Sequence, residues 1–283
     1  MHKTHLFILL AFTCSFHLEQ KLQAQQLGEY LGEGEEYILY TQTKQVNQFF
    51  RRFNGEELPS GKRLYARDSL FRSWELRKEY LPFIVDQEAP FVEESSYLPF
   101  ESVILDSLDP VFLDFHGDNW FAEVLTTFEY KGQPQKVILF LKLEKAKVGS
   151  KWVLVNVYFE YFQEIFSQDK NKEASPAFIH PMSHELDFMN LIKVFRNGGN
   201  LEPYAQQGYR PDYLTLFLYE IKKENLVFQS VEGTKFHFFQ VPGWYFVVSE
   251  VMRSGPYRGW MITQLASLPP GGKEQLLPFI YRE

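Results

Sequence analysis

Three apolar-rich segments separated only by short turns restrict the fold of this chain more than any other feature. The middle segment, residues 136–146, alternates strictly from Val137 through Leu139 and Leu141 to Leu143, which is the side-chain period of a β-strand. The intervening turns, KGQP and KVGSK, are too short for a crossover, so neighbouring strands must run antiparallel. The pattern therefore predicts an antiparallel meander. Its strands span residues 120–130, 136–146 and 151–159.

A second series of strand-like segments follows in the C-terminal part of the chain, separated by the turns EGT, PG and SGPYRG. One of these segments, YRGWMITQL, is similar to GSKWVLVNV in the first meander. Each follows a turn signal, has a basic residue shortly before its tryptophan and a polar residue four positions after it. The similarity indicates one structural unit used twice, although two coincidences of common residues would give the same pattern. The second series is predicted at residues 226–231, 235–241, 244–252 and 260–267.

Helices are predicted before each meander. In the first half, apolar residues near helical spacing predict a helix over residues 35–53, which stops at Asn54-Gly55 because both residues tolerate the left-handed conformation. A second helix is predicted over residues 66–80 and is ended by Pro82. The proline- and acid-containing stretch 81–112 reads as an irregular connection.

The second half repeats this order of elements. Ser183 is predicted to cap a helix with the apolar stripe Leu186, Met189, Ile192 and Phe195, and this helix runs into RNGGN. The stop IKVFRNGGNL matches FFRRFNGEEL in the first half, since both place an aromatic residue and an arginine before Asn-Gly and a leucine after it. A further helix is predicted over residues 212–223.

Helices followed by a curved antiparallel meander resemble the NTF2-like, cone-shaped α+β families. The resemblance covers most of residues 30–165 and 183–268. It implies that helices cover the concave face of each sheet and leave an apolar pocket. We therefore expect an α+β fold of two NTF2-like units, over residues 25–166 and 183–283, joined by a polar linker at 167–182.

The first 24 residues have the pattern of a signal peptide. Leu6–Phe16 is an almost unbroken apolar run after a mildly basic start, and it is too short to span a membrane comfortably. We expect cleavage after Ala24 and export to the periplasm, the cell surface or the medium. Cys14, the only cysteine, lies in this run, so the cleaved chain has no disulfide. Acylation of Cys14, which would tether the protein to a membrane, and a buried N-terminal helix are the alternatives.

Composition excludes some classes of partner and chemistry. The formal net charge of −7 repels phosphate backbones and anionic lipid surfaces, so nucleic acid is not expected as a partner. The sequence has no Gly-rich phosphate loop, no Cys-based metal site and no G-x-S-x-G elbow. We therefore expect neither a cofactor nor a bound metal.

The segment DFHGDNW is the strongest candidate for catalysis. In a strand, Asp114, His116 and Asp118 would project from one face, where a carboxylate and an imidazole form a general-base pair or bind a divalent metal. The resemblance to NTF2-like enzymes implies proton transfer by such groups. The alternative is a turn at Gly117 and Asp118-Asn119, which would leave these side chains in water.

Two other histidine sites are weaker candidates. In HPMSHE, His180 and His184 have the four-residue spacing of a metal pair on a helix, but Pro181 and Ser183 favour a linker followed by a capped helix. In KFHFFQ, His237 is either a hydrogen-bonded strand histidine or a pocket group.

Aromatic residues, 17% of the chain, are the candidate ligand-binding groups. On curved strands they would either line a pocket or pack in the core. The five candidates are Trp120, Trp152, Trp244, Tyr245 and Trp260.

These observations lead to an exported, non-enzymatic binding protein of the cell envelope, which holds a small apolar ligand or a protein partner in concave sheet pockets. An NTF2-like lyase, isomerase or hydrolase that uses His116 with Asp114 or Asp118 is the alternative. A third possibility is a structural protein that assembles through the edges of its sheets.

Overall fold

The structure is a computed structural model that describes residues 43–147, 149–166, 179–189, 191–196, 201–253 and 258–282. The predicted signal peptide, with Cys14 and Ala24, lies outside these residues, as does the predicted linker up to residue 178. None of the helices in the described part of the chain has the length and apolarity that crossing a bilayer requires.

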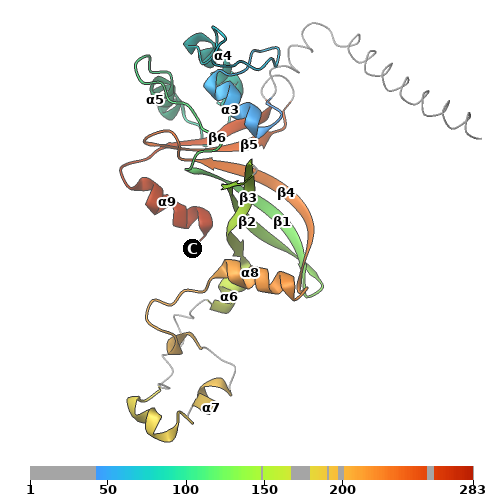
Figure 1. Cartoon of the computed structure of the whole chain (residues 1–283), viewed down its shortest axis with the longest axis vertical. Coiled ribbons are helices and arrows are strands. Elements are labelled where there is room, and N and C mark those ends of the chain that lie inside the picture. The colour runs from blue at the N-terminus through green and yellow to red at the C-terminus, as the bar shows by residue number, and fades with distance from the viewer. Residues whose placement is uncertain are drawn as a thin grey trace, which may run out of the picture. The chain divides into compact units, whose positions relative to one another are not determined.

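The described strands form one antiparallel sheet in the order β3-β2-β1-β4-β5-β6 (Figure 1). Both predicted meanders are present and the α+β class is confirmed, but the prediction of two separate sheets is wrong. The first strands of the two meanders, β1 and β4, are neighbours. A lone meander leaves unpaired backbone groups along both edges, and joining two meanders removes one edge from each. The strands are β1 Trp120–Tyr130, β2 Gln133–Ala146, β3 Gly149–Phe159, β4 Leu226–Phe238, β5 Trp244–Val251 and β6 Gly259–Ser267.

Among the described residues, three helices precede the sheet and others follow its first meander. The α-helices are α3 Val46–Asn54, α4 Trp74–Ile84, α5 Glu94–Ile104, α6 Glu160–Phe166, α7 Leu191–Phe195, α8 Tyr213–Lys222 and α9 Gly272–Tyr281. Two 3₁₀ helices, η1 Pro181–Leu186 and η2 Glu202–Tyr204, flank α7.

The predicted turn at EGT does not exist. Residues 226–238 form the single strand β4, in which Gly233 does not adopt the left-handed conformation of a turn. The strand continues through this point because Glu232 is held in the sheet. The Glu232 carboxylate accepts a hydrogen bond from the Thr127 hydroxyl of β1 and forms an ion pair with Lys136 of β2. These side-chain contacts within the sheet favour extended backbone where the sequence suggested a turn.

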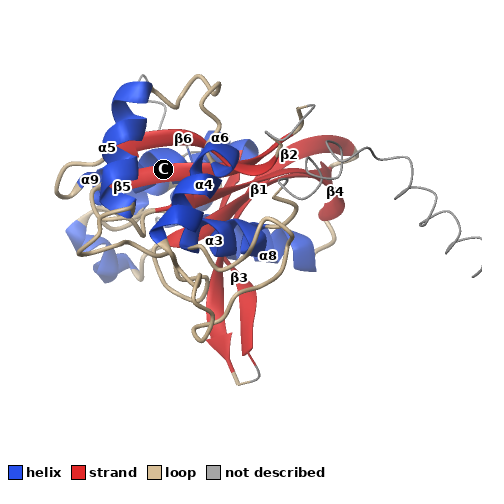
Figure 2. Cartoon of the chain, turned by 90° about the horizontal axis from the view of Figure 1, so that it is seen from above, coloured by secondary structure: helices blue, strands red, loops and turns tan. Residues whose placement is uncertain are grey.

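The turn between β1 and β2 is tighter than predicted. Lys131 and Gly132 both have positive φ, 53° and 75°, as the favoured two-residue hairpin turns require, and Tyr130 pairs directly with Gln133. Strand β2 therefore begins before the predicted residue 136. The far ends of β2 and β3 run out together as a two-stranded ribbon (Figure 2).

The N-terminal helices differ from prediction at their starts and at prolines. The first stops at Asn54 with Gly55 in the left-handed conformation, which confirms the Asn-Gly stop. Helix α4 begins after the cap Ser73 and continues past Pro82, because the Val85 N–H still bonds the Leu81 carbonyl at 3.0 Å. Helix α5, which contains Pro99, lies where an irregular connection was predicted.

The helix predicted from Ser183 is also wrong. Residues 181–186 form a 3₁₀ helix capped by His180, and Ser183 is buried inside it. Asp187 and Phe188 then adopt left-handed backbone angles, φ 48° and 54°, which interrupt the helix before the short α7. The counterpart Asn-Gly stop at 197–200 lies outside the described residues.

The chain divides into two compact units, each built from separated stretches of sequence. Unit 1 falls within residues 1–120 and 235–273, and unit 2 within residues 121–234 and 274–283. In unit 1, helices α3, α4 and α5 contact β6, and α3 places Phe49 and Phe53 against Phe238 and Phe246. The rings of Phe238 and Phe246 stack with their centroids 4.8 Å apart. This ring cluster is the core of unit 1.

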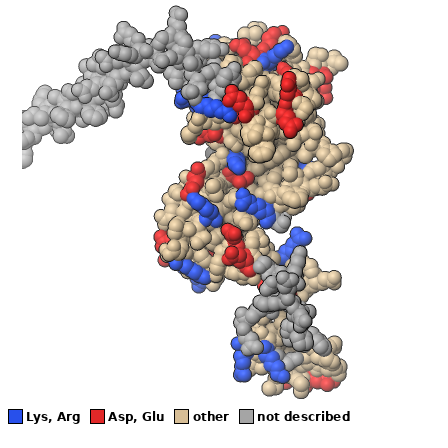
Figure 3. Space-filling model, turned by 180° about the vertical axis from the view of Figure 1, so that it is seen from behind, with Lys and Arg blue, Asp and Glu red and all other residues tan. Residues whose placement is uncertain are grey.

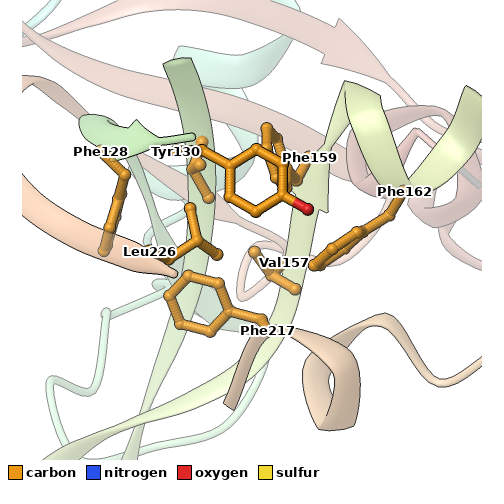
Figure 4. Packing of buried hydrophobic residues seen from close by; sticks show 8 residues of the cluster. Phe128, Tyr130, Val157, Phe159, Phe162, Phe217 and Leu226 are labelled. Atoms are coloured by element: carbon orange, nitrogen blue, oxygen red, sulfur yellow. The ribbon is translucent and has the colours of Figure 1, made fainter. Parts of the chain in front are cut away.

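Unit 2 has a core on each face of its strands. Helix α8 packs on β3 and inserts Phe217 among buried side chains of β1, β3, β4 and α6 (Figure 4). On the opposite face, Phe121 and Phe140 contact Tyr281 of α9. The first core contains Phe128, Tyr130, Val137, Val157, Phe159, Phe162, Phe217 and Leu226.

Candidate functional site

The segment around His116 is an exposed turn. The Asp114 carboxylate accepts the His116 backbone N–H at 2.9 Å, and the Asp114 carbonyl accepts the Gly117 N–H. Asn119 is left-handed, with φ 66°. The side chains of Asp114, His116 and Asp118 are all exposed, so the structure places them in the arrangement of the turn alternative.

A glutamine from the C-terminal part of unit 1 holds this turn. The Gln240 side-chain amide donates to the carbonyls of Asp114 and Asp118 at 2.8 and 2.9 Å, and its oxygen accepts the Asp114 N–H at 2.9 Å. Backbone atoms of the turn are therefore used for structure. Among the described residues, no three His, Cys, Asp or Glu side chains come together as a metal-binding group.

Three of the five candidate ligand-binding rings are buried, and all three lie in unit 1. Trp120 stacks on Phe238 with centroids 5.5 Å apart, and Trp244 meets Phe100 edge-on at 5.4 Å. Tyr245 is also buried, and its hydroxyl is 2.8 Å from His237 Nδ1. The buried His237 is therefore a hydrogen-bonded strand histidine, as one alternative predicted.

The other two rings begin the similar strands β6 and β3. Trp260 is partly buried and contacts Phe236 edge-on at 5.1 Å, while Trp152 is 40% exposed on the β2–β3 ribbon. The structure thus does not bring the five rings together around one cleft. The clefts found in the described residues are lined by other side chains.

The histidines of HPMSHE serve the local backbone. His180 Nδ1 accepts the Met182 N–H at 3.1 Å, and His184 Nδ1 lies 2.9 Å from the Pro181 carbonyl oxygen. Both imidazoles belong to the 3₁₀ turn rather than to a metal pair on a helix.

The motif FFRRFNGEEL is a structural centre of unit 1. The Glu57 carboxylate is buried and accepts hydrogen bonds from Arg51 and Arg52. The Asn54 side chain bonds both backbone groups of Leu113 at 2.8 Å. Buried charges are tolerated when they are paired and hydrogen-bonded. Because the polar side chains of the motif bond one another and the backbone, we assign the motif a structural role.

A buried arginine completes this centre. Arg77 donates to the carbonyls of Phe53 and Val111 at 3.1 and 2.6 Å. Burial, together with the smaller effect of the nearby Arg72 charge, lowers the pKa of the Arg77 guanidinium to about 10. Because this pKa still lies far above neutral pH, the side chain remains charged and fixes the backbone around α3.

The feature that the sequence did not predict is a set of exposed apolar side chains between positions 182 and 195. The four residues of the predicted stripe, Leu186, Met189, Ile192 and Phe195, are among these exposed side chains. We call these residues the apolar patch. It consists of Met182, Leu186, Phe188, Met189, Ile192 and Phe195, which are 47% to 74% exposed.

Local backbone bonds hold the patch residues in place. The Phe188 N–H bonds the Ser183 carbonyl at 3.0 Å, the Met189 N–H bonds Leu186 at 2.9 Å and the Ile192 N–H bonds Met189 at 3.3 Å. The stretch is therefore a series of turns displaying apolar side chains. The periodicity of these residues is visible in the sequence, but their exposure is not. An apolar stripe has the same sequence pattern whether its own chain or another protein covers it.

Charges beside the patch cancel. Glu185 and Asp187 precede the α7 stretch, and Lys193 and Arg196 lie within or just after it. Figure 3 likewise shows basic and acidic side chains interspersed on the face that it draws. The patch therefore lacks the excess of basic residues that attracts anionic surfaces.

Comparison with known proteins returned no match: no protein-family model, curated protein or solved structure matches this chain.

Proposed function

We propose that this chain is an exported, non-enzymatic binding protein of the cell envelope, and that the ligand it binds is another protein. The observation that carries the proposal is the apolar patch. Burying a large apolar side chain contributes about 1.5–3 kcal/mol relative to leaving it exposed. Six such side chains in one short stretch are typical of an interaction surface.

The spacing of the patch favours a groove on a partner protein. Ile192 and Phe195 lie three residues apart on α7, which is a spacing used by the anchors of helices that lie in apolar grooves, and Met189 lies in the turn before this helix. The balanced charge of the stretch argues against an anionic membrane as the binding surface. The aromatic candidates are largely committed to the core of unit 1, which argues against a small apolar ligand between those rings.

The order of elements in the chain is the feature on which the NTF2-like resemblance rests. In the described part of the chain, three helices precede a long antiparallel sheet, and one sheet is present instead of the two that were predicted. The exposed position of His116 disfavours the enzymatic alternative, since a general base works in a site from which water is largely excluded.

Site-specific photo-crosslinking in the native host tests the proposal. A crosslinking amino acid at Ile192 is expected to give a discrete protein adduct, whereas one at Leu108, a 94% exposed apolar residue outside the patch, is not. The identified partner, once purified, should bind the Phe195→Ser variant at least about tenfold more weakly, a loss of roughly 1.4 kcal/mol. The Leu108→Ser variant is the matched control and should bind normally.

Other products of the same experiment would contradict the proposal. Lipid adducts at Ile192 would identify a membrane surface, and adducts of the chain with itself, with a dimer in size-exclusion chromatography, would identify self-assembly. Identical adducts from both positions would show non-specific contact.

Export is tested separately by the intact mass of the protein from its host. Cleavage after Ala24 gives a chain that begins at Gln25. A chain that begins at an acylated Cys14 would identify a lipoprotein, and a chain that retains residue 1 would contradict export.

A further inference from the structure

A cleft in unit 1 contains an arginine whose hydrogen-bonding capacity is only partly used. The cleft has a volume of about 530 Å³ and lies beside the end of β5 and the start of β6. Its charged and long apolar lining residues are Lys44, Glu250, Met252, Arg253 and Arg258.

A buried carboxylate holds the guanidinium of Arg253. Nη1 and Nη2 donate to the two oxygens of Asp86 at 2.7 and 2.9 Å, and the Asp86 side chain is only 4% exposed. Asp86 is itself fixed, because its backbone N–H bonds the Ile262 carbonyl of β6 at 2.9 Å. Nη1 also donates to Glu88 at 3.0 Å.

Two of the N–H groups of Arg253 are not used by Asp86 and Glu88. A guanidinium has five N–H groups in a rigid planar arrangement. Asp86 and Glu88 take three of them, two on Nη1 and one on Nη2. The Nε–H and the second N–H of Nη2 bond no residue in the described part of the chain. These two groups lie on one edge of the guanidinium and point in parallel, which is the geometry that binds both oxygens of a carboxylate.

The charges of the surroundings direct an anion to this cleft. Arg253 also lines a smaller cleft of about 220 Å³, but Asp86 and Glu88 line that one and would repel an anion. The larger cleft has Lys44 and Arg258 against the single carboxylate of Glu250. Glu88 is 79% exposed, so solvent screens its charge.

We propose that the larger cleft binds an organic carboxylate, with Arg253 as its bidentate anchor and Lys44 and Arg258 as supporting charges. Met252, 86% exposed on the same cleft, offers an apolar contact to the remainder of such a molecule. Asp86 keeps the guanidinium in place and lowers the loss of conformational entropy on binding. This site is independent of the apolar patch, which belongs to unit 2.

Titration of the full chain with N-acetyl-leucine, followed by NMR, tests the proposal, and N-acetyl-leucine amide is the uncharged control ligand. The acid is expected to saturate at millimolar concentrations and to shift signals of Arg253 and Met252, while the amide does not. The Arg253→Lys variant keeps the charge but loses the paired donors, so the acid should bind it about tenfold more weakly.

Matched variants separate charge from fold. Lys44→Gln and Arg258→Gln should each weaken binding a few-fold. Lys62→Gln, which removes an exposed lysine of unit 1 outside the cleft, should leave binding unchanged. Thermal unfolding of each variant shows that it is folded. Equal binding of acid and amide, absence of saturation, or unchanged binding by a folded Arg253→Lys variant would overturn the proposal.

Discussion

The strands β3 and β6 begin alike and are stabilised differently. Each contains one of the two similar tryptophan segments, and each lies at an end of the strand order. Both also carry a bulge three residues after the tryptophan. Val155 is the extra residue between the pairs Phe140–Asn156 and Leu141–Leu154. Thr263 is the extra residue in β6, between the pairs Val247–Gln264 and Val248–Ile262.

The two strands differ in the backbone segments that pair with their outer edges. Backbone segments bridge to β6 at three places: the Trp260 N–H bonds Thr43, the Asp86 N–H bonds Ile262 and the Leu265 N–H bonds Phe91, at 2.8 to 3.0 Å. Helices contact both strands, α3, α4 and α5 at β6 and α6 and α8 at β3. Similar local sequences therefore form a bulged strand in both places, and separate parts of the chain determine whether backbone bridges are added, as they are at β6.

The largest expected effects come from removing one core ring for each strand, Phe246 of β5, which pairs with Leu265 of β6, and Phe159 at the end of β3. Phe246→Ala and Phe159→Ala each delete a fully buried ring, and either should lower the free energy of unfolding by about 3–5 kcal/mol. Hydrogen exchange should show loss of amide protection beginning at Trp260 and Leu265 in the first variant and within β3 in the second. Equal loss throughout both variants would show that the two units unfold as one.

Glycines near the start of the two strands give the next largest contrast. A Cβ on Gly259 would lie 2.2 Å from the Thr43 carbonyl oxygen, and its φ is +97°, whereas Gly149, with φ +113°, has open space around it. We expect Gly259→Ala to cost about 2–4 kcal/mol of stability and Gly149→Ala only about 1–2 kcal/mol, since the latter introduces backbone strain without a clash.

Exchange of a single amide checks the cause. The Trp260 N–H loses its Thr43 acceptor in Gly259→Ala and should exchange faster than in the parent protein, while it should not change in Gly149→Ala. Similar stabilities of the two variants would remove the distinction between the strands.

The smallest contrast concerns the cap of the helix that packs on β3. The Asp212 carboxylate accepts the Thr215 hydroxyl and backbone N–H at 2.6 and 3.1 Å, and these bonds hold the pKa of Asp212 below its usual range. Asp212→Ala should lower stability by about 1 kcal/mol at neutral pH. Protection of β3 amides should fall with it, while β6 should be unaffected.

The pH dependence follows from the lowered pKa of Asp212. A carboxyl group with a folded-state pKa below its unfolded value of about 4 stabilises the protein above that value and loses this contribution as the pH falls through the folded pKa. Urea unfolding should therefore show parent and Asp212→Ala converging below about pH 4. Asp212→Asn, which keeps a neutral cap, should show no such convergence with Asp212→Ala. A difference that persists at pH 2 would contradict the assignment.

Local patterns predicted most of the sheet. The alternation from Val137 to Leu143 and the short turns gave the first meander, and the Asn54-Gly55 stop gave the end of α3. The pairing of β1 with β4 could not be predicted, because no local sequence pattern specifies which edge strands of two meanders pair. The turn at EGT failed because Glu232 is held by residues about a hundred positions away.

The candidate sites were harder to predict for a related reason. The stripe from Leu186 to Phe195 was visible in the sequence, but its exposure depends on whether other segments of the chain pack against it. The Asp86–Arg253 pair joins residues far apart in the chain, and neither residue belongs to a recognisable motif. Solvent exposure and long-range pairing are properties of the tertiary structure, so a single sequence read locally does not contain them.

The division of unit 1 into two stretches of sequence has a consequence for synthesis. The rings of α3 emerge from the ribosome early, but Phe238 and Phe246, on which they pack, come near the other end of the chain. The phenylalanines of α3, Phe49 and Phe53, therefore lack these partner rings until all of residues 121–234 have been translated. Chaperones that hold nascent chains therefore have a long interval in which to bind the N-terminal helices, and unit 1 completes its core only after Phe238 and Phe246 have been translated.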